Sequence, residues 1–147
     1  MVVRPETIRV RLKKLDEMIA RLERIRARGA EEYYDDAMLQ LATERALQIA
    51  TQCVLDIGNH IIAETSLPLP EDNDEIISTL VQANILSPEL GKKLKGLGGF
   101  RNALVHDYVT LDHEHIFREH LGRLDDLRDF AAEVVAFVDR LEKGSAS

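Results

Sequence analysis

The stretch ERALQIATQCVLDIGNHIIAE, residues 44–64, repeats apolar side chains at the spacing of a helix. Projected at about 100° per residue, these side chains fall on one arc. The arc contains Ala46, Ile49, Ala50, Cys53, Val54, Ile57 and Ile61. The opposite arc is polar and contains Glu44, Arg45, Gln48, Gln52, Asp56 and Asn59. The stretch therefore predicts a long amphipathic helix with one side packed into a core.

The polar arc of this helix is rich in amide side chains and contains no lysine. A helix face exposed to water usually carries pairs of glutamate and lysine. Two interpretations stay open: an ordinary solvent-exposed face, or a face that meets a second subunit, a ligand or a buried arginine. We therefore treat all six polar residues as candidates for a binding cleft or a dimer face.

Apolar residues also recur with helical period before this stretch. A first helix is expected to begin near Pro5, which suits the first turn of a helix. Its stripe consists of Ile8, Leu12, Leu15, Ile19 and Leu22. The second helix is expected from about residue 34 to about residue 64, because the following TSLPLPEDND contains two prolines that no helix interior tolerates.

Three more helices are predicted after the prolines. Asn73 is a candidate cap for a short helix over residues 74–82. The next helix begins at Ser87, as its N-cap followed by a proline, and is expected to carry GFRNALVHDY, residues 99–108. A last helix is expected from about residue 112 to about residue 143. Its predicted stripe consists of Leu121, Leu124, Ala131, Val135 and Val138.

No segment alternates apolar and polar residues with the period of a strand, so the fold should be all-α. We predict an antiparallel helical bundle of four main helices plus a short extra helix. The 147 residues fit a single domain over residues 1–143, with a flexible tail at 144–147. No apolar run has the length of a signal peptide or of a membrane helix, so we expect a cytoplasmic protein that does not bind membranes.

The formal net charge of −7 argues against attraction of the whole surface to nucleic acid. A local basic patch nevertheless lies in GKKLKGLGGFR, residues 91–101. Its lysines, Lys92, Lys93 and Lys95, are candidates for substrate binding. An ordinary solvated helix face has the same composition and stays an alternative.

Arg101 interrupts an apolar stripe. Leu90, Leu94 and Leu97 are spaced by four and three residues, and the next positions in that rhythm are 101 and 104. Arg101 is therefore predicted on the inward side of its helix. Because burying an unpaired guanidinium is costly, the site needs a carboxylate partner, a water-filled cleft or a subunit interface.

Two further polar residues accompany this arginine. Asn102 and His106 are one helical turn apart, and Arg101 stands beside them. A guanidinium can hold phosphate oxygens, and an imidazole can move a proton near neutral pH. The group is typical of a site that cleaves a phosphodiester, although on spacing alone a structural role stays an alternative.

The segment RNALVHDY, residues 101–108, resembles the signature of the HEPN superfamily, and specifically that of its HepT-like toxins. That signature is Arg, Asn, three residues, His, one residue and Tyr. Residues 44–64 look like the long second helix of this family, and residues 97–112 look like its active-site segment. The resemblance implies a metal-independent endoribonuclease without a cofactor, in which two copies of the bundle form a homodimer and bring their motifs into a shared cleft.

The resemblance also implies residue roles. Arg101 and His106 would be the catalytic pair, acting on an RNA substrate, and Asn102 a supporting residue. Tyr108 would be the tyrosine on which an MNT-type nucleotidyltransferase antitoxin places adenylyl groups. From the residues alone, Tyr108 has a second interpretation, in which its ring packs where the helix ends. Asp107 should point away from the site, because its charge would repel RNA phosphate.

A second function stays open, in which the same fold is a non-catalytic module. Arg101 would then pair with Glu44 or Asp56 to fix the dimer, and the surface would bind a nucleotidyltransferase or a nucleotide.

The remaining histidines receive structural interpretations. His113, His115 and His120 lack metal-ligand spacing, so we expect no metal site but a solvated group near a helix start. His60 is expected to be a packing residue with satisfied hydrogen bonds.

Overall fold

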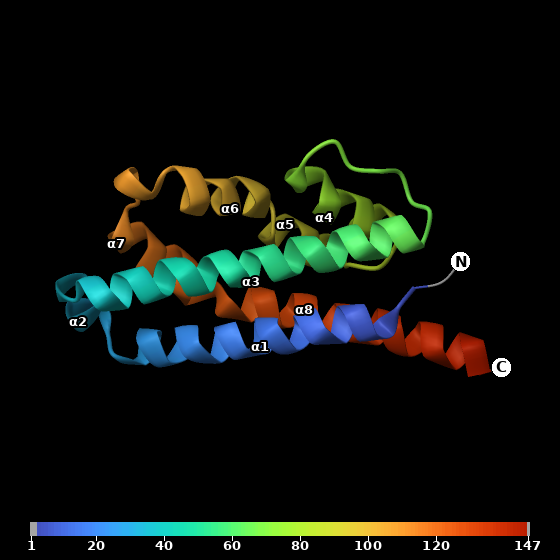
Figure 1. Ribbon diagram of the computed structural model, residues 1–147, viewed down its shortest axis with the longest axis horizontal. Helices are drawn as coiled ribbons and strands as arrows, with labels where there is room; N and C mark the ends of the chain where they lie inside the picture. Colours follow the sequence, from blue (N-terminus) through green and yellow to red (C-terminus); the bar gives the residue numbers. More distant parts are fainter. Residues whose placement is uncertain (1–2, 147) are drawn as a thin grey trace.

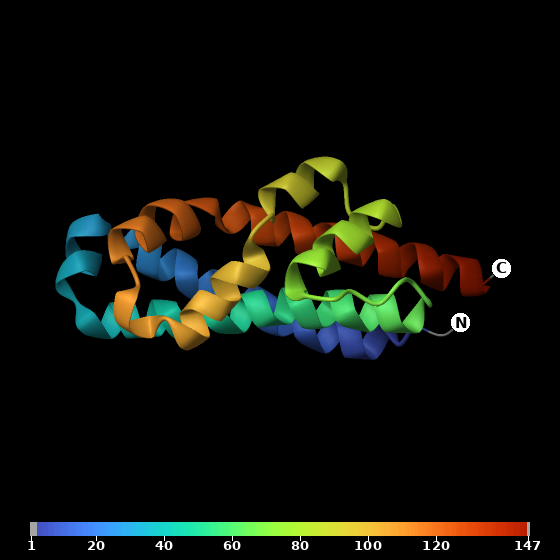
Figure 2. The ribbon, with the colours of Figure 1, turned by 90° about the horizontal axis from the view of Figure 1, so that it is seen from above.

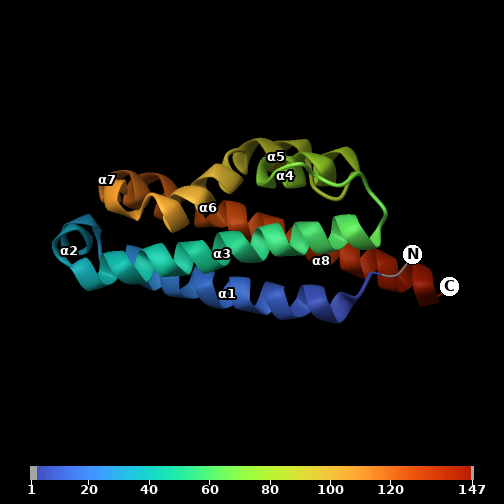
Figure 3. The ribbon, with the colours of Figure 1, turned by 45° about the horizontal axis from the view of Figure 1, so that its top comes forward.

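The computed structural model describes residues 3–146, and every regular element within that part is helical. Three long helices lie side by side along the molecule (Figure 1), namely α1 (Pro5–Ala27), α3 (Ala37–Glu64) and α8 (Leu124–Ala146). Helix α1 runs antiparallel to the other two. The short helices α4 (Asn73–Gln82), α5 (Pro88–Lys93) and α6 (Leu97–His106) lie on one side of α3, with α1 on the other (Figure 3). The predicted all-α antiparallel bundle is confirmed.

The core follows the predicted helical stripes. All five apolar residues predicted for α1 are buried, and in α3 all of the apolar arc is buried except the half-buried Ile49. Each fully buried leucine or isoleucine stabilises the fold by about 1.5–3 kcal/mol. The amphipathic pattern of α3 therefore places its apolar arc inside the bundle and leaves its polar arc available on the surface.

Acidic and hydroxyl side chains cap several of the helices. Asp36 accepts hydrogen bonds from the amides of residues 38 and 39, at 2.9 and 3.2 Å, so α3 begins at residue 37 rather than near residue 34. A separate helix, α2 (Ala30–Asp35), precedes it. Asp72, not Asn73, caps α4 by accepting from the amide of residue 75 at 3.0 Å. Ser87 caps α5 as predicted.

The expected helix from Ser87 through the motif is wrong as a single helix. Gly96 has a φ of 88°, in the left-handed region, and it separates α5 from α6. A glycine accepts this conformation because it has no β-carbon to clash. The bend turns α6 over the N-terminal half of α3, where it runs antiparallel to α3 (Figure 2). The leucine stripe consequently breaks: Leu94 and Leu104 are buried, whereas Leu97 is half-buried.

The C-terminal helix is also interrupted. Asp112 caps α7 (His113–His115), which is followed by η2 (Ile116–His120), η3 (Leu121–Arg123) and α8. The predicted stripe is wrong at Val135, which is 45% exposed. The buried residues of α8 are instead Leu124, Leu127, Phe130, Val134 and Val138.

The end of the chain differs from the expected tail. Helix α8 continues to Ala146, whereas the sequence led us to expect a flexible tail over 144–147. Ser147 lies outside the described residues, so a flexible tail and a domain boundary at 143 stay predictions. No helix in the described part combines the length and the apolar character that crossing a membrane requires.

Candidate functional site

Arg101 lies on α6 and contacts the polar arc of α3. Its Nε donates to Gln52 Oε1 at 2.8 Å, and its Nη1 donates to Asn102 Oδ1 at 3.2 Å. Among the described residues, no carboxylate lies within ion-pair distance of Arg101, and Glu44 and Asp56 have other partners within the chain. A pairing of Arg101 with Glu44 or Asp56 across a dimer stays a prediction. The half-buried guanidinium is held by two amide oxygens instead. Its Nη2 has no hydrogen-bond partner in the described part of the chain.

Gln52 connects Arg101 to a chain of polar groups. Its Nε2 donates to Asp56 Oδ1 at 2.8 Å, while its Oε1 accepts from Arg101. Asp56 Oδ2 in turn lies 3.9 Å from Nε of Arg11, on α1. One orientation of the Gln52 amide satisfies both neighbours. Asp56 thus has Gln52 and Arg11 as its partners. Gln52 holds Arg101 in position without neutralising the charge of its guanidinium.

His106 and Tyr108 lie beyond Arg101, where α6 ends. His106 is exposed, is one turn from Asn102, and has no polar partner among the described residues. Tyr108 begins η1 (Tyr108–Thr110) and is 66% exposed, so the interpretation in which its ring packs at the helix end is wrong. Asp107 is also exposed. Imidazole and phenol are thus both free to meet a molecule from solution.

The polar arc of α3 is not an ordinary solvent-exposed face. Glu44, Gln48, Gln52 and Asp56 are half-buried, and only Arg45 and Asn59 are exposed. The arginine that this face was expected to meet is Arg101, through Gln52. A meeting of the same face with a second subunit stays a prediction.

The three candidate lysines lie at the other end of α6. Lys92 and Lys93 belong to α5, Lys95 follows it, and all three are exposed. The ten residues of α6 span about 15 Å, which separates these lysines from His106. Lys93 and Lys95 instead border a cavity of about 110 Å³ whose walls include Phe100 and His120. The structure does not bring the lysines close to His106, and their role in substrate binding stays a prediction.

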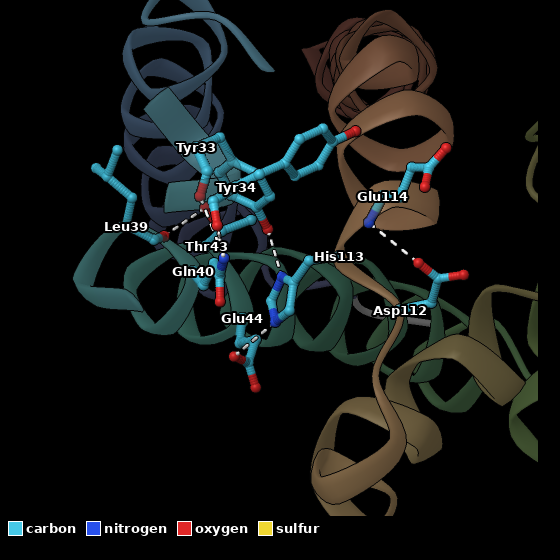
Figure 4. A network of polar contacts seen from close by, with 9 residues as sticks. All are labelled: Tyr33, Tyr34, Leu39, Gln40, Thr43, Glu44, Asp112, His113 and Glu114. Atoms are coloured by element: carbon cyan, nitrogen blue, oxygen red, sulfur yellow. Dashed lines mark hydrogen bonds and ion pairs between the residues drawn. The ribbon is translucent and has the colours of Figure 1, made fainter. Parts of the chain in front are cut away.

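His113 is not part of a solvated group, as the sequence led us to expect. Its Nδ1 lies 2.6 Å from the hydroxyl of Tyr33, and its Nε2 lies 3.3 Å from Glu44 Oε2 (Figure 4). No motif or spacing in the sequence indicated Tyr33 as a partner of His113. The hydroxyl and the ring are 80 residues apart in the chain, so no local pattern could have indicated their contact.

Two other histidines are enclosed as well. His120 stacks on Phe100, with ring centroids 3.6 Å apart. Burial, together with the nearby positive charges of His115 and Arg123, lowers the pKa of His120 to about 4, so this ring is neutral at pH 7. The expectation that His60 has satisfied hydrogen bonds is wrong, because its buried Nε2 has no hydrogen-bond partner among the described residues. The described part of the chain contains no group of three His, Cys, Asp or Glu side chains that could hold a metal ion.

Comparison with known proteins agrees with the resemblance of the motif. Residues 15–134 match the family model described as Ribonuclease HepT-like. A tRNA nuclease HepT from Aphanizomenon flos-aquae is 28% identical over 141 residues, which cover 96% of each chain. An mRNA nuclease HepT from Shewanella oneidensis is 29% identical over 114 residues, covering 76% of this chain and 85% of the relative.

A solved structure shares the fold. It is the tri-AMPylated HEPN toxin of Shewanella oneidensis in complex with MNT antitoxin, and it superposes with a TM-score of 0.76 at 26% identity. The superposition covers 88% of this chain and 96% of that one. With a family model matched over most of its length, this chain belongs to the HepT-like ribonuclease family.

Proposed function

We propose that this protein is a metal-independent endoribonuclease toxin whose reaction takes place at Arg101 and His106. The observation that carries the proposal is the arrangement on α6. A guanidinium held by Gln52 keeps an Nη2 without a partner among the described residues, and the exposed His106 follows within the same helix. Membership in the HepT-like family and two nuclease relatives support the same conclusion.

The proposed reaction uses the ribose of the RNA as the nucleophile. His106, as a neutral imidazole, takes the proton from a 2'-hydroxyl, and the resulting alkoxide attacks the adjacent phosphorus. The bond from phosphorus to the 5'-oxygen breaks, and that oxygen leaves with a proton. The products are a 2',3'-cyclic phosphate and a 5'-hydroxyl. Arg101 stabilises the negative charge on the phosphorane oxygens, which removes the need for a metal ion. Asn102 supports Arg101 by accepting from its Nη1.

Protonation of the leaving oxygen requires a second proton carrier. We place His106 of a second subunit in that role, with the polar arc of α3 facing the shared cleft of a homodimer. The exposed Arg45 and Asn59 remain available for such a contact. Sedimentation of the active protein tests this arrangement, because a monomer with full activity would contradict it.

Control of the toxin is proposed to act at Tyr108. Its side chain is exposed enough for an MNT-type nucleotidyltransferase antitoxin to reach the hydroxyl. An adenylyl group there adds a charged phosphate two residues from His106, where it would block and repel RNA. The AMPylated relative in complex with an MNT antitoxin supports this proposal.

The first test is RNA cleavage by protein whose intact mass shows no modification, in excess EDTA. Wild type is compared with His106→Ala and with His115→Ala, which removes an exposed histidine from α7. We expect cleavage with 2',3'-cyclic ends by wild type and His115→Ala only. Loss of cleavage in EDTA would contradict metal independence. No cleavage of total cellular RNA by unmodified, dimeric wild type would favour the non-catalytic module instead.

A further inference from the structure

A second polar cluster joins three helices at the end of the bundle where α3 begins. It consists of Tyr33 on α2, Glu44 on α3 and His113 at the start of α7 (Figure 4). The Tyr33 hydroxyl and His113 Nδ1 are 2.6 Å apart, and His113 Nε2 lies 3.3 Å from Glu44 Oε2. With the ring hydrogen on Nε2, the hydroxyl donates to Nδ1 and the ring donates to the carboxylate.

This cluster is shielded from solution. Tyr33 is fully buried and its ring packs against Phe117, with centroids 5.2 Å apart. The side chains of His113 and Glu44 are each 20% exposed. Burial raises the pKa of Tyr33 to about 12, so its hydroxyl keeps its proton and remains a donor at neutral pH. Both ring nitrogens of His113 are occupied, which leaves none to transfer a proton to a substrate.

His113 lies at the end of the loop that follows His106, so its contacts hold one end of that loop. Residues 107–112 join α6 to α7, begin directly after His106 and include Tyr108. Tyr108 and Val109 are 66% and 83% exposed, so little packing holds the middle of this loop. Among the described residues, His113 is the first after His106 whose side chain makes a polar contact with α2 or α3.

We propose that Tyr33, Glu44 and His113 are positioning residues that fix the loop 107–112, and with it Tyr108 and the end of α6, against α2 and α3. Tyr33 is fully buried and packs against Phe117, so its hydroxyl anchors the imidazole. Glu44 holds the opposite nitrogen and prevents the ring from turning. The effect on catalysis rests on the proposed ribonuclease function, whereas the effect on the loop does not.

The test compares Tyr33→Phe with Tyr34→Phe in the full chain. Both variants keep their rings against Phe117, but only the first removes a hydroxyl that contacts His113. NMR hydrogen exchange is read at the hydrogen-bonded amides of residues 110 and 114–116. We expect about tenfold faster exchange there in Tyr33→Phe, with amides of α1 unchanged, and wild-type exchange in Tyr34→Phe. RNA cleavage by Tyr33→Phe should show kcat lowered about tenfold and KM unchanged.

His113→Gln provides a second variant that leaves Tyr33 intact. Glutamine can reach Glu44 but not the Tyr33 hydroxyl, so it should reproduce the faster exchange. Adding Tyr33→Phe should bring no further change, because both variants remove the same contact. Wild-type exchange at residues 110 and 114–116 in both single variants would overturn the proposal, as would faster exchange spread over the whole bundle. If wild type cleaves no RNA and the variants still exchange faster at these residues, the positioning role holds and the ribonuclease function is wrong.

Discussion

Two polar clusters lie against the same face of α3, and they differ in what they leave open. In the first, Gln52 holds Arg101, whose Nη2 has no partner in the described part of the chain, and His106 is exposed beyond it. In the second, Glu44 and Tyr33 occupy both nitrogens of His113. An exposed imidazole with free nitrogens can exchange protons with a substrate. The His113 ring instead has Glu44 and the buried Tyr33 as its partners, and we assign it a structural role.

The difference between the two clusters distinguishes residues that the reaction needs from residues that stabilise the fold. A group that protein atoms do not satisfy adds little to the folded state, so its removal should affect activity alone. A group that satisfies buried partners stabilises the fold, and its removal leaves those partners without hydrogen bonds. Four predictions test this separation, and they run from the largest expected effect to the smallest.

His106→Ala should lower the cleavage rate by about 10²–10⁴-fold, because it removes the proposed proton acceptor. The free energy of unfolding should stay within about 0.5 kcal/mol of wild type, because the side chain is exposed and has no polar partner in the described part of the chain. Single-turnover cleavage and urea denaturation of the same preparation measure both quantities. A clearly lower free energy of unfolding would show that His106, like His113, stabilises the fold through contacts within the protein.

The enclosed His120 should make stability depend on pH. Its pKa in the folded protein is about 4, below the ordinary 6.5, so the unfolded chain binds more protons between these pH values. The contribution of His120 to the free energy of unfolding is therefore fully present above pH 6.5 and is lost as the pH falls toward 4. We expect a loss of about 1–3 kcal/mol, measured by urea denaturation. His120→Phe keeps a ring against Phe100 without the titration, and an equal loss in this variant would assign the effect to other groups.

Gln52→Ala should lower kcat about tenfold, because Arg101 loses the acceptor that holds its Nε. Gln82→Ala is the matched control, since that glutamine is exposed at the end of α4. Cleavage kinetics of the two variants measure the effect. Equal rates for Gln52→Ala and wild type would mean that the guanidinium keeps its position without α3.

Replacing Lys92, Lys93 and Lys95 by alanine should have the smallest effect. These side chains lie about 15 Å along α6 from His106, so they can contact RNA only outside the reacting phosphate. We expect RNA binding to weaken by a few-fold, with a reduced dependence on salt and an unchanged rate for bound RNA. A slower rate at saturating RNA would place the lysines at the reaction itself.

Much of the fold could be read from local sequence. Apolar spacing located five buried residues of α1 and one side of the buried face of α3, but it missed Leu47, Leu55 and Ile62 on α3. Ser87 was correctly identified as a cap. The break at Gly96 was missed because the leucines on either side continue a helical rhythm that a left-handed glycine interrupts. The stripe of α8 was misplaced at Val135 because Leu127, Phe130 and Val134 form the buried face of that helix instead.

The sequence by itself determined the helices, the buried arc of α3, and the resemblance of the motif that carries Arg101, His106 and Tyr108. These features depend on neighbours three or four residues away, which the order of residues fixes directly. Only the tertiary structure decided which polar groups are satisfied. Arg101 could have met Glu44 or Asp56, but the path of α6 over α3 gave it Gln52, and burial of Tyr33 placed a donor beside His113. Such contacts join residues distant in the chain, and they exist only once the helices have packed.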